Sequence, residues 1–121
     1  MANVQKTYAL VLGIVLAIVG IWGLFTNSIL GIFGVNLTQS IVHLIGAAFG
    51  LYAGLKGDGA GFNAWLGWIG VILGVLGFIP TVGHNPGEWL NTVFNINSSI
   101  SLLHIVIGVV SLGVFYWADK D

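Results

Sequence analysis

Four apolar runs, each long enough to cross a lipid bilayer, account for most of this 121-residue chain. They extend over residues 6–25, 37–56, 62–80 and 98–118. A helix needs about 20 apolar residues to span the hydrocarbon core, because each residue adds about 1.5 Å along its axis. Only 6% of the residues are charged, against about 25% in soluble domains, which is too few to cover a soluble surface. We therefore expect an all-α integral membrane protein with four transmembrane helices in a single domain, residues 1–121.

The positions of the basic residues predict how these helices are oriented. The three lysines, Lys6, Lys56 and Lys120, lie at the start of the first run, between the second and third runs, and after the last run. With four crossings, these positions share one side of the membrane. Positive residues favour the cytoplasmic side, so we expect both termini in the cytoplasm. The membrane we expect is a bacterial-type plasma membrane or an internal energy-transducing membrane.

The two halves of the chain, residues 6–56 and 62–118, carry the same pattern of glycines and polar residues. Glycines of the first and third runs correspond at one constant offset: Gly13, Gly20 and Gly23 with Gly67, Gly74 and Gly77. Polar residues of the second and fourth runs correspond at another: Asn36, Ser40 and His43 with Asn97, Ser101 and His104. The offsets differ because of an insertion around residues 80–88 in the second external loop. Each half holds two crossings and enters the membrane in the same direction. We therefore expect a four-helix bundle of two parallel two-helix repeats, with a pseudo-two-fold axis along the membrane normal.

Small residues line one face of the first and third runs. The glycines of these faces are Gly13, Gly20 and Gly23 in the first run and Gly67, Gly70, Gly74 and Gly77 in the third. Inside lipid, helices associate through close van der Waals packing, which small residues permit. We interpret both faces as helix-packing surfaces. A flat cofactor or a lipid pigment lying in the same groove is the alternative.

A narrow polar stripe opens the second run and the fourth. Each stripe has Asn, then Ser four residues later, then His three residues further, and these offsets fall within about 60° of one another on a helix. We expect Asn36 and Asn97 to be N-caps, because an asparagine side chain accepts a hydrogen bond from an otherwise unpaired amide at a helix start. His43 and His104 should then lie at equal depth, about 10 Å along their helices from the caps.

The two histidines allow two interpretations. In the first, each imidazole donates to a neighbouring carbonyl, serine or asparagine, and the stripes determine which helices meet. In the second, His43 and His104 lie on diagonal helices and bind metal, either as axial ligands of one haem iron or each in its own tetrapyrrole. Two acceptors for the imidazoles and two glycines that let a flat ring approach would complete that site: Ser40, Ser101, Gly46 and Gly108. Zinc is disfavoured, because no carboxylate or thiol shares the depth of the histidines.

The segments around these stripes resemble a known family. "FGVN…HLIGAAFGL" in the second run, followed by a further Asn-x6-His in the fourth, is similar to small bacterial membrane proteins catalogued only as a domain of unknown function. The resemblance covers most of the chain and implies a four-helix membrane architecture. It implies no activity and no catalytic residues.

Sequence features typical of an enzyme or a nucleic-acid binder are missing. The chain has no Ser–His–carboxylate set and no phosphate-binding loop, and its acidic residues lie at or beyond the membrane boundary. A net charge of −1 without arginine disfavours nucleic acid as a partner. We therefore expect a non-enzymatic structural or accessory subunit of a membrane assembly, without a cofactor. Its expected partners are the lipid bilayer and either other membrane subunits or a second copy of the chain.

Two alternative functions stay open. One is a membrane protein in which the histidine pair binds haem b or chlorophyll, for electron transfer or light harvesting. The other is a small oligomeric channel or carrier, because polar stripes can line a path across the membrane.

Overall fold

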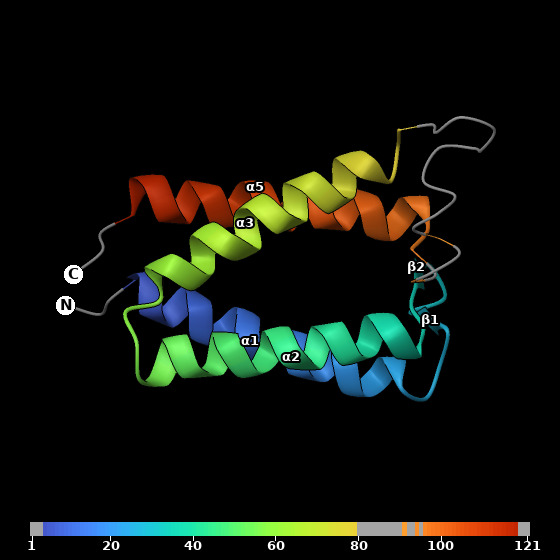
Figure 1. Ribbon diagram of the computed structural model, residues 1–121, viewed down its shortest axis with the longest axis horizontal. Coiled ribbons are helices and arrows are strands. Elements are labelled where there is room, and N and C mark those ends of the chain that lie inside the picture. Colours follow the sequence, from blue (N-terminus) through green and yellow to red (C-terminus); the bar gives the residue numbers. More distant parts are fainter. Residues whose placement is uncertain (1–3, 80–90, 92–93, 95, 119–121) are drawn as a thin grey trace.

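The computed structural model describes residues 4–79, 91, 94 and 96–118. These residues form four helices, α1 (Val4–Gly23), α2 (Leu37–Leu55), α3 (Ala60–Leu76) and α5 (Ser98–Trp117), as Figure 1 shows. The helices α1, α2 and α5 are long and apolar enough to cross a membrane, whereas α3 is apolar but shorter, with 17 residues. The prediction of an all-α chain is confirmed, and its helices are compatible with an integral membrane protein.

The helices α2 and α5 begin at corresponding asparagines. The Asn36 Oδ1 atom accepts a hydrogen bond of 2.8 Å from the backbone amide of Gln39. In α5, the Asn97 Oδ1 atom accepts one of 3.0 Å from the amide of Ile100. Each bond satisfies an amide that has no partner within its own helix. Because both helices start at the same position of the polar stripe, the histidines lie two turns further along each helix.

The four helices are arranged as two antiparallel hairpins, α1 with α2 and α3 with α5. Contacts within each hairpin are extensive, and those between the hairpins are few (Figure 1). The loop between α1 and α2 adds a short antiparallel strand pair, β1 (Ser28–Ile29) with β2 (Phe33–Gly34). Its turn contains Leu30 and Gly31, both with positive φ. The sequence did not predict these strands. The predicted insertion, residues 80–88, lies outside the described residues.

Glycines allow the two helices of each hairpin to approach closely. A β-carbon on Gly13 would lie 2.7 Å from the backbone nitrogen of Leu51, and one on Gly67 would lie 2.7 Å from the side chain of Leu112. The other glycines of these faces, Gly20, Gly23, Gly70, Gly74 and Gly77, likewise lie against the partner helix. The small-residue faces are therefore the surfaces along which each hairpin packs.

Polar side chains join the two hairpins at the end where α1 begins. Gln5 on α1 donates a hydrogen bond of 2.5 Å to the carbonyl of Val114 on α5. Asn63 on α3 donates to the Gln5 carbonyl at 2.9 Å, and the Tyr8 hydroxyl is hydrogen-bonded to the Ser111 hydroxyl at 2.6 Å. These bonds connect α1 to both helices of the other hairpin.

A second set of polar contacts joins the hairpins at the opposite end. Gln39 at the start of α2 donates hydrogen bonds to the carbonyls of Phe94, at 2.7 Å, and Gly34, at 3.0 Å. Asn97, the cap of α5, donates to the carbonyl of Ile32 at 3.0 Å. The hairpins are therefore connected by hydrogen bonds near both ends.

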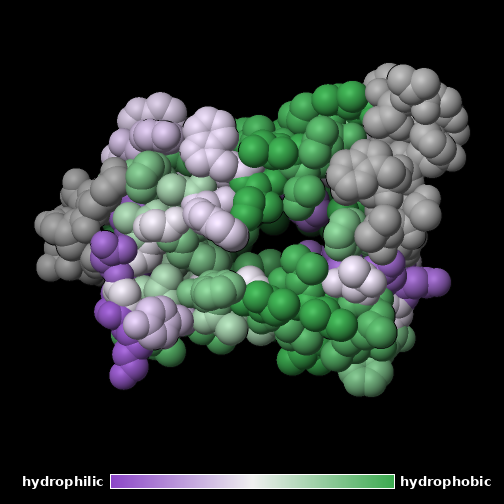
Figure 2. Space-filling view, viewed as in Figure 1, coloured by the Kyte–Doolittle hydropathy of each residue, from purple (hydrophilic) through white to green (hydrophobic). Residues whose placement is uncertain are grey.

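The outer surface of the protein is more apolar than its interior. Ile18, Phe49, Ile72 and Val109, one from each helix, are all more than half exposed. Figure 2 shows that hydrophobic side chains cover the middle of the molecule and hydrophilic ones lie toward its ends. The largest fully buried side chains are mostly polar: Gln5, Asn63, Ser40, Ser101 and Ser111, with Val35. This distribution is typical of a protein whose exterior contacts lipid.

Candidate functional site

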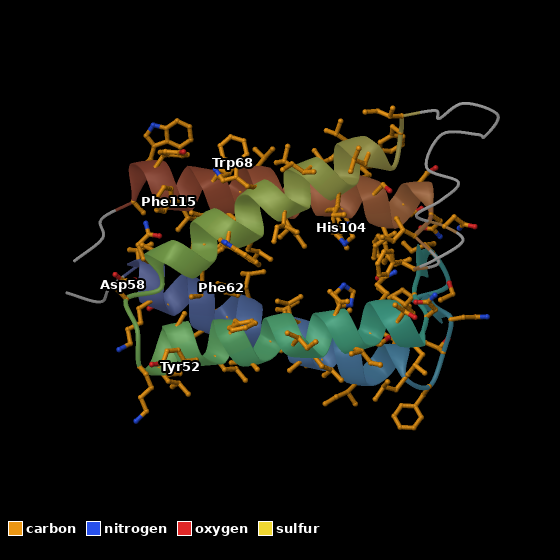
Figure 3. All side chains as sticks on the ribbon, viewed as in Figure 1. Tyr52, Asp58, Phe62, Trp68, His104 and Phe115 are labelled. Carbon is orange, nitrogen blue, oxygen red and sulfur yellow. The ribbon has the colours of Figure 1, made fainter. Side chains whose placement is uncertain are left out.

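His43 and His104 face the space between the two hairpins. Figure 2 shows an opening between the hairpins, with a small hydrophilic patch on each side of it in an otherwise hydrophobic region. In Figure 3 the His104 side chain points from α5 toward the other hairpin. The His43 imidazole lies near enough to that of His104 for the two to interact electrostatically. The structure therefore brings the two predicted histidines together.

The local sequence determines the position of each histidine. His43 lies two helical turns after the Asn36 cap, and His104 lies two turns after the Asn97 cap. Because the rise is about 1.5 Å per residue, each imidazole is about 10 Å along its helix from the cap. The helices α2 and α5 each pack one side against the glycines of the other helix in the same hairpin. The histidines are left on a neighbouring face, toward the other hairpin.

The Nδ1 atom of each imidazole is buried and unpaired. Neither Nδ1 has a hydrogen-bond partner among the residues that the structure describes. A buried polar atom without a partner costs about 1–3 kcal/mol, so proteins rarely retain one without a reason. The first interpretation expected each imidazole to donate to a neighbouring carbonyl, serine or asparagine, and neither Nδ1 atom makes such a bond within the described residues.

Ser40 and Ser101 do not serve the histidines. The Oγ atom of Ser40 lies against Gly23, and that of Ser101 lies against Gly77, each within its own hairpin. Neither hydroxyl has a hydrogen-bond partner in the described part of the chain. The prediction that these serines accept hydrogen bonds from the imidazoles is wrong, because the close contact with glycine holds each hydroxyl between two helices.

The glycines that were expected to admit a flat ring also pack within their hairpins. A β-carbon on Gly108 would lie 2.5 Å from the backbone nitrogen of Val71 and 2.7 Å from the carbonyl oxygen of Gly67. A β-carbon on Gly46 would lie 3.4 Å from the Leu16 side chain. Because α3 already covers Gly108, the prediction that this glycine lines a cofactor site is wrong. Gly46 is only half-buried, and its place at a cofactor site stays a prediction.

Gln39 belongs to the site, although the sequence analysis did not include it among the candidate residues. It lies one turn before His43 on the same face of α2 and is 3% exposed. While its amide nitrogen joins the hairpins, its Oε1 atom is buried and has no partner among the described residues. The four-residue spacing between Gln39 and His43 could have identified Gln39 as part of the site, because residues four apart share a helix face. In the other hairpin, the corresponding residue is the buried Ile100.

The site does not have the ligands of a bare metal ion. Over residues 4–79, 91, 94 and 96–118, no group of three or more His, Cys, Asp or Glu side chains could hold one. A divalent ion between two neutral imidazoles would also keep its full charge inside the apolar region, which is costly. The donor set therefore suits a neutral molecule.

Comparison with known proteins gives no relative. No protein-family model, no curated protein and no solved structure matches the chain. The resemblance to small bacterial membrane proteins of unknown function stays a prediction. The function is therefore argued from the geometry of the histidine pair.

Proposed function

We propose that this protein is a non-enzymatic accessory subunit of a membrane assembly and that it holds a lipid-soluble cofactor between its two hairpins. His43 and His104 are the residues that bind the cofactor. One observation carries this proposal: the His43 and His104 imidazoles lie within electrostatic range of each other, and the buried Nδ1 atom of each has no partner within the described chain. Ionisable or polar groups placed inside an apolar layer are costly and are therefore commonly functional.

The proposed architecture is a duplicated hairpin with a pseudo-two-fold axis along the membrane normal. Its support comes from matching contacts in the two hairpins. Gly20 lies against Leu44, and the corresponding Gly74 lies against the corresponding Ile105. In this proposed arrangement the two histidines lie at equal depth, as a ligand bound from both sides requires. In this proposal Lys6 and Lys56 lie on the cytoplasmic side.

The assembly role rests on how much apolar surface the helices expose. Trp65 and Trp68 on α3 are 70% and 50% exposed, and together with Ile69 and Ile72 they line an apolar groove on the outside of α3. In this proposal the exposed apolar faces of the helices are the main contact surfaces of the protein. Its partners in this proposal are lipid and other membrane subunits or a second copy.

A tetrapyrrole is one candidate for this cofactor. Two imidazoles on opposite sides of one opening are the arrangement that axial ligation of a single haem iron needs. A ring whose own charge compensates that of the metal would also avoid burying a net charge. Such a cofactor would be held by His43 and His104, as the sequence interpretation expected.

Extraction of the purified protein tests the proposal. The full chain, isolated from native membranes in mild detergent, should retain one small molecule per chain that organic solvent releases for mass spectrometry. His43→Ala and His104→Ala should lose it. Val42→Ala and Val106→Ala, which change lipid-facing neighbours of the histidines, should keep it. Equal retention in the histidine variants, or a wild-type protein without any bound molecule, would contradict the proposal.

A further inference from the structure

The hydrogen-bonding state of the two imidazoles follows from their surroundings. A neutral imidazole carries one N–H group, on either Nδ1 or Nε2. Both Nδ1 atoms are buried with no acceptor among the described residues. Buried N–H groups without an acceptor are rarer in proteins than unpaired acceptors, so Nδ1 is the unfavourable place for the proton. The surroundings therefore favour the N–H on Nε2 in both rings.

Axial ligation of a metal through Nε2 needs the proton on Nδ1 instead of on Nε2. A histidine that binds a metal through Nε2 offers the lone pair of that atom and donates Nδ1–H to a nearby acceptor. The two serines that could have been those acceptors lie against Gly23 and Gly77 instead. The site is therefore better suited to present two N–H donors than two metal ligands.

The opening that these donors face is reached from the side of the molecule. It lies between the hairpins in the hydrophobic middle of the protein (Figure 2). Toward the end where α1 begins, Phe62 of α3 lies over α2, where a β-carbon on Gly50 would be 2.8 Å from its ring. Toward the other end, the Gln39 amide bonded to the Phe94 carbonyl joins the hairpins. A ligand that enters between these two contacts comes from the lipid phase.

We propose that the ligand is a lipid-soluble quinone whose two carbonyl oxygens accept hydrogen bonds from the Nε2–H groups of His43 and His104. This inference rests on the proposed function and names the chemical class of its cofactor. A 1,4-quinone has acceptors on opposite edges of a flat ring, which matches two donors on opposite sides of one opening. It is also neutral, and its apolar tail can remain among the lipids.

The test uses the full chain in lipid nanodiscs and a decyl-substituted 1,4-benzoquinone labelled with carbon-13 at both carbonyls. In wild type, the infrared carbonyl bands should shift to lower frequency on binding, because both oxygens accept hydrogen bonds. His43→Phe and His104→Phe should each return one band to its unbound frequency and weaken binding roughly tenfold, as expected for the loss of one hydrogen bond. Val106→Ala, which changes a lipid-facing residue, should behave as wild type.

A conservative variant separates hydrogen bonding from folding. His104→Gln keeps an N–H donor, so it should retain the shifted band where His104→Phe loses it. Unshifted carbonyl bands in wild type, or binding that both histidine variants leave unchanged, would overturn the quinone inference. A Soret band from the native protein would overturn it as well, while leaving the proposed cofactor function standing with a tetrapyrrole. A native protein with no extractable molecule would contradict both.

Discussion

The hydroxyl oxygen of Ser40 lies where a β-carbon on Gly23 would have to be. Ser101 holds the same position against Gly77 in the other hairpin. In each hairpin, this contact brings two helices together at one level, next to the turn that carries the histidine. A side chain at either glycine would separate the helices and displace the polar stripe.

We predict that Gly23→Ala destabilises the protein and that Ser40→Ala in the same chain restores it. The added methyl group overlaps the Ser40 hydroxyl, and overpacking of this kind costs about 1–3 kcal/mol. Once the hydroxyl is removed, the nearest remaining atoms, Ser40 Cβ and Val35 Cγ2, are 3.4 Å away, an ordinary contact. The experiment is a double-mutant cycle of four proteins: wild type, the two single variants and the double variant. Thermal unfolding in detergent, followed by circular dichroism, measures the stability of each.

Gly61→Ala is the matched control, because a β-carbon there meets no atom within 4 Å. It should leave the melting temperature within error of wild type. Additive effects of Gly23→Ala and Ser40→Ala would show that the hydroxyl is not what fills this space.

We predict that Asn63→Leu loosens the connection between the hairpins. This substitution removes both hydrogen bonds that the Asn63 amide makes to Gln5, one to its carbonyl and one to its side chain. Hydrogen bonds between helices in a membrane are worth about 0.6–1.7 kcal/mol. Spin labels at Leu55→Cys and Trp117→Cys, both on exposed positions near this end, should report a broader distance distribution.

Thr7→Val serves as the control for this experiment. Thr7 is exposed on α1 beside the same cluster, so the distance distribution should keep its wild-type width. A distribution that Asn63→Leu leaves unchanged would mean that other contacts hold the hairpins at this end.

The sequence predicted the features that depend on spacing along a single helix. The caps at Asn36 and Asn97, and the shared direction of His43 and His104, follow from one periodicity that both halves repeat. The direction of Ser40 does not follow from it. That hydroxyl turns toward its own hairpin because Gly23 leaves room there, and the contact depends on how two helices cross.

The sequence could not predict the hydrogen bonds between the hairpins, for a different reason. Gln5 bonds to Val114 and Asn63, which lie 109 and 58 residues away in the chain. Neither Gln5 nor Asn63 belongs to the repeated pattern, so neither carried a local signal. The strand pair formed by residues 28–29 and 33–34 was missed because two-residue strands give too short a pattern to detect.

We predict that Asn97→Ala costs more stability than Asn97→Asp. Aspartate keeps the Oδ1 acceptor that caps α5 and places a favourable negative charge at the helix start, but it loses the bond to the Ile32 carbonyl. Alanine loses both interactions, and loss of the cap alone costs about 1 kcal/mol. Hydrogen exchange at the Ile100 amide should be fastest in Asn97→Ala, intermediate in Asn97→Asp and slowest in wild type. Ser99→Ala, at an exposed neighbouring position, should exchange as wild type does. Faster exchange in the aspartate variant than in the alanine variant would contradict this account of the cap.

We predict that Lys56 faces the cytoplasm and that Leu30 faces the opposite side. The chain has no cysteine, so Lys56→Cys and Leu30→Cys each introduce a single thiol. Leu30 is 68% exposed and lies in the turn before α2, whereas Lys56 is the C-terminal cap of the same helix. A membrane-impermeant maleimide added to intact cells should therefore label only Leu30→Cys, and disrupting the membrane should make Lys56→Cys reactive.

Because the bias comes from three lysines on one side, changing Lys6, Lys56 and Lys120 to glutamine should produce chains in both orientations, with both sites partly labelled in intact cells. Labelling of Lys56→Cys alone would place the termini outside, and labelling of both sites in the otherwise unchanged chain would show that α2 does not cross the membrane.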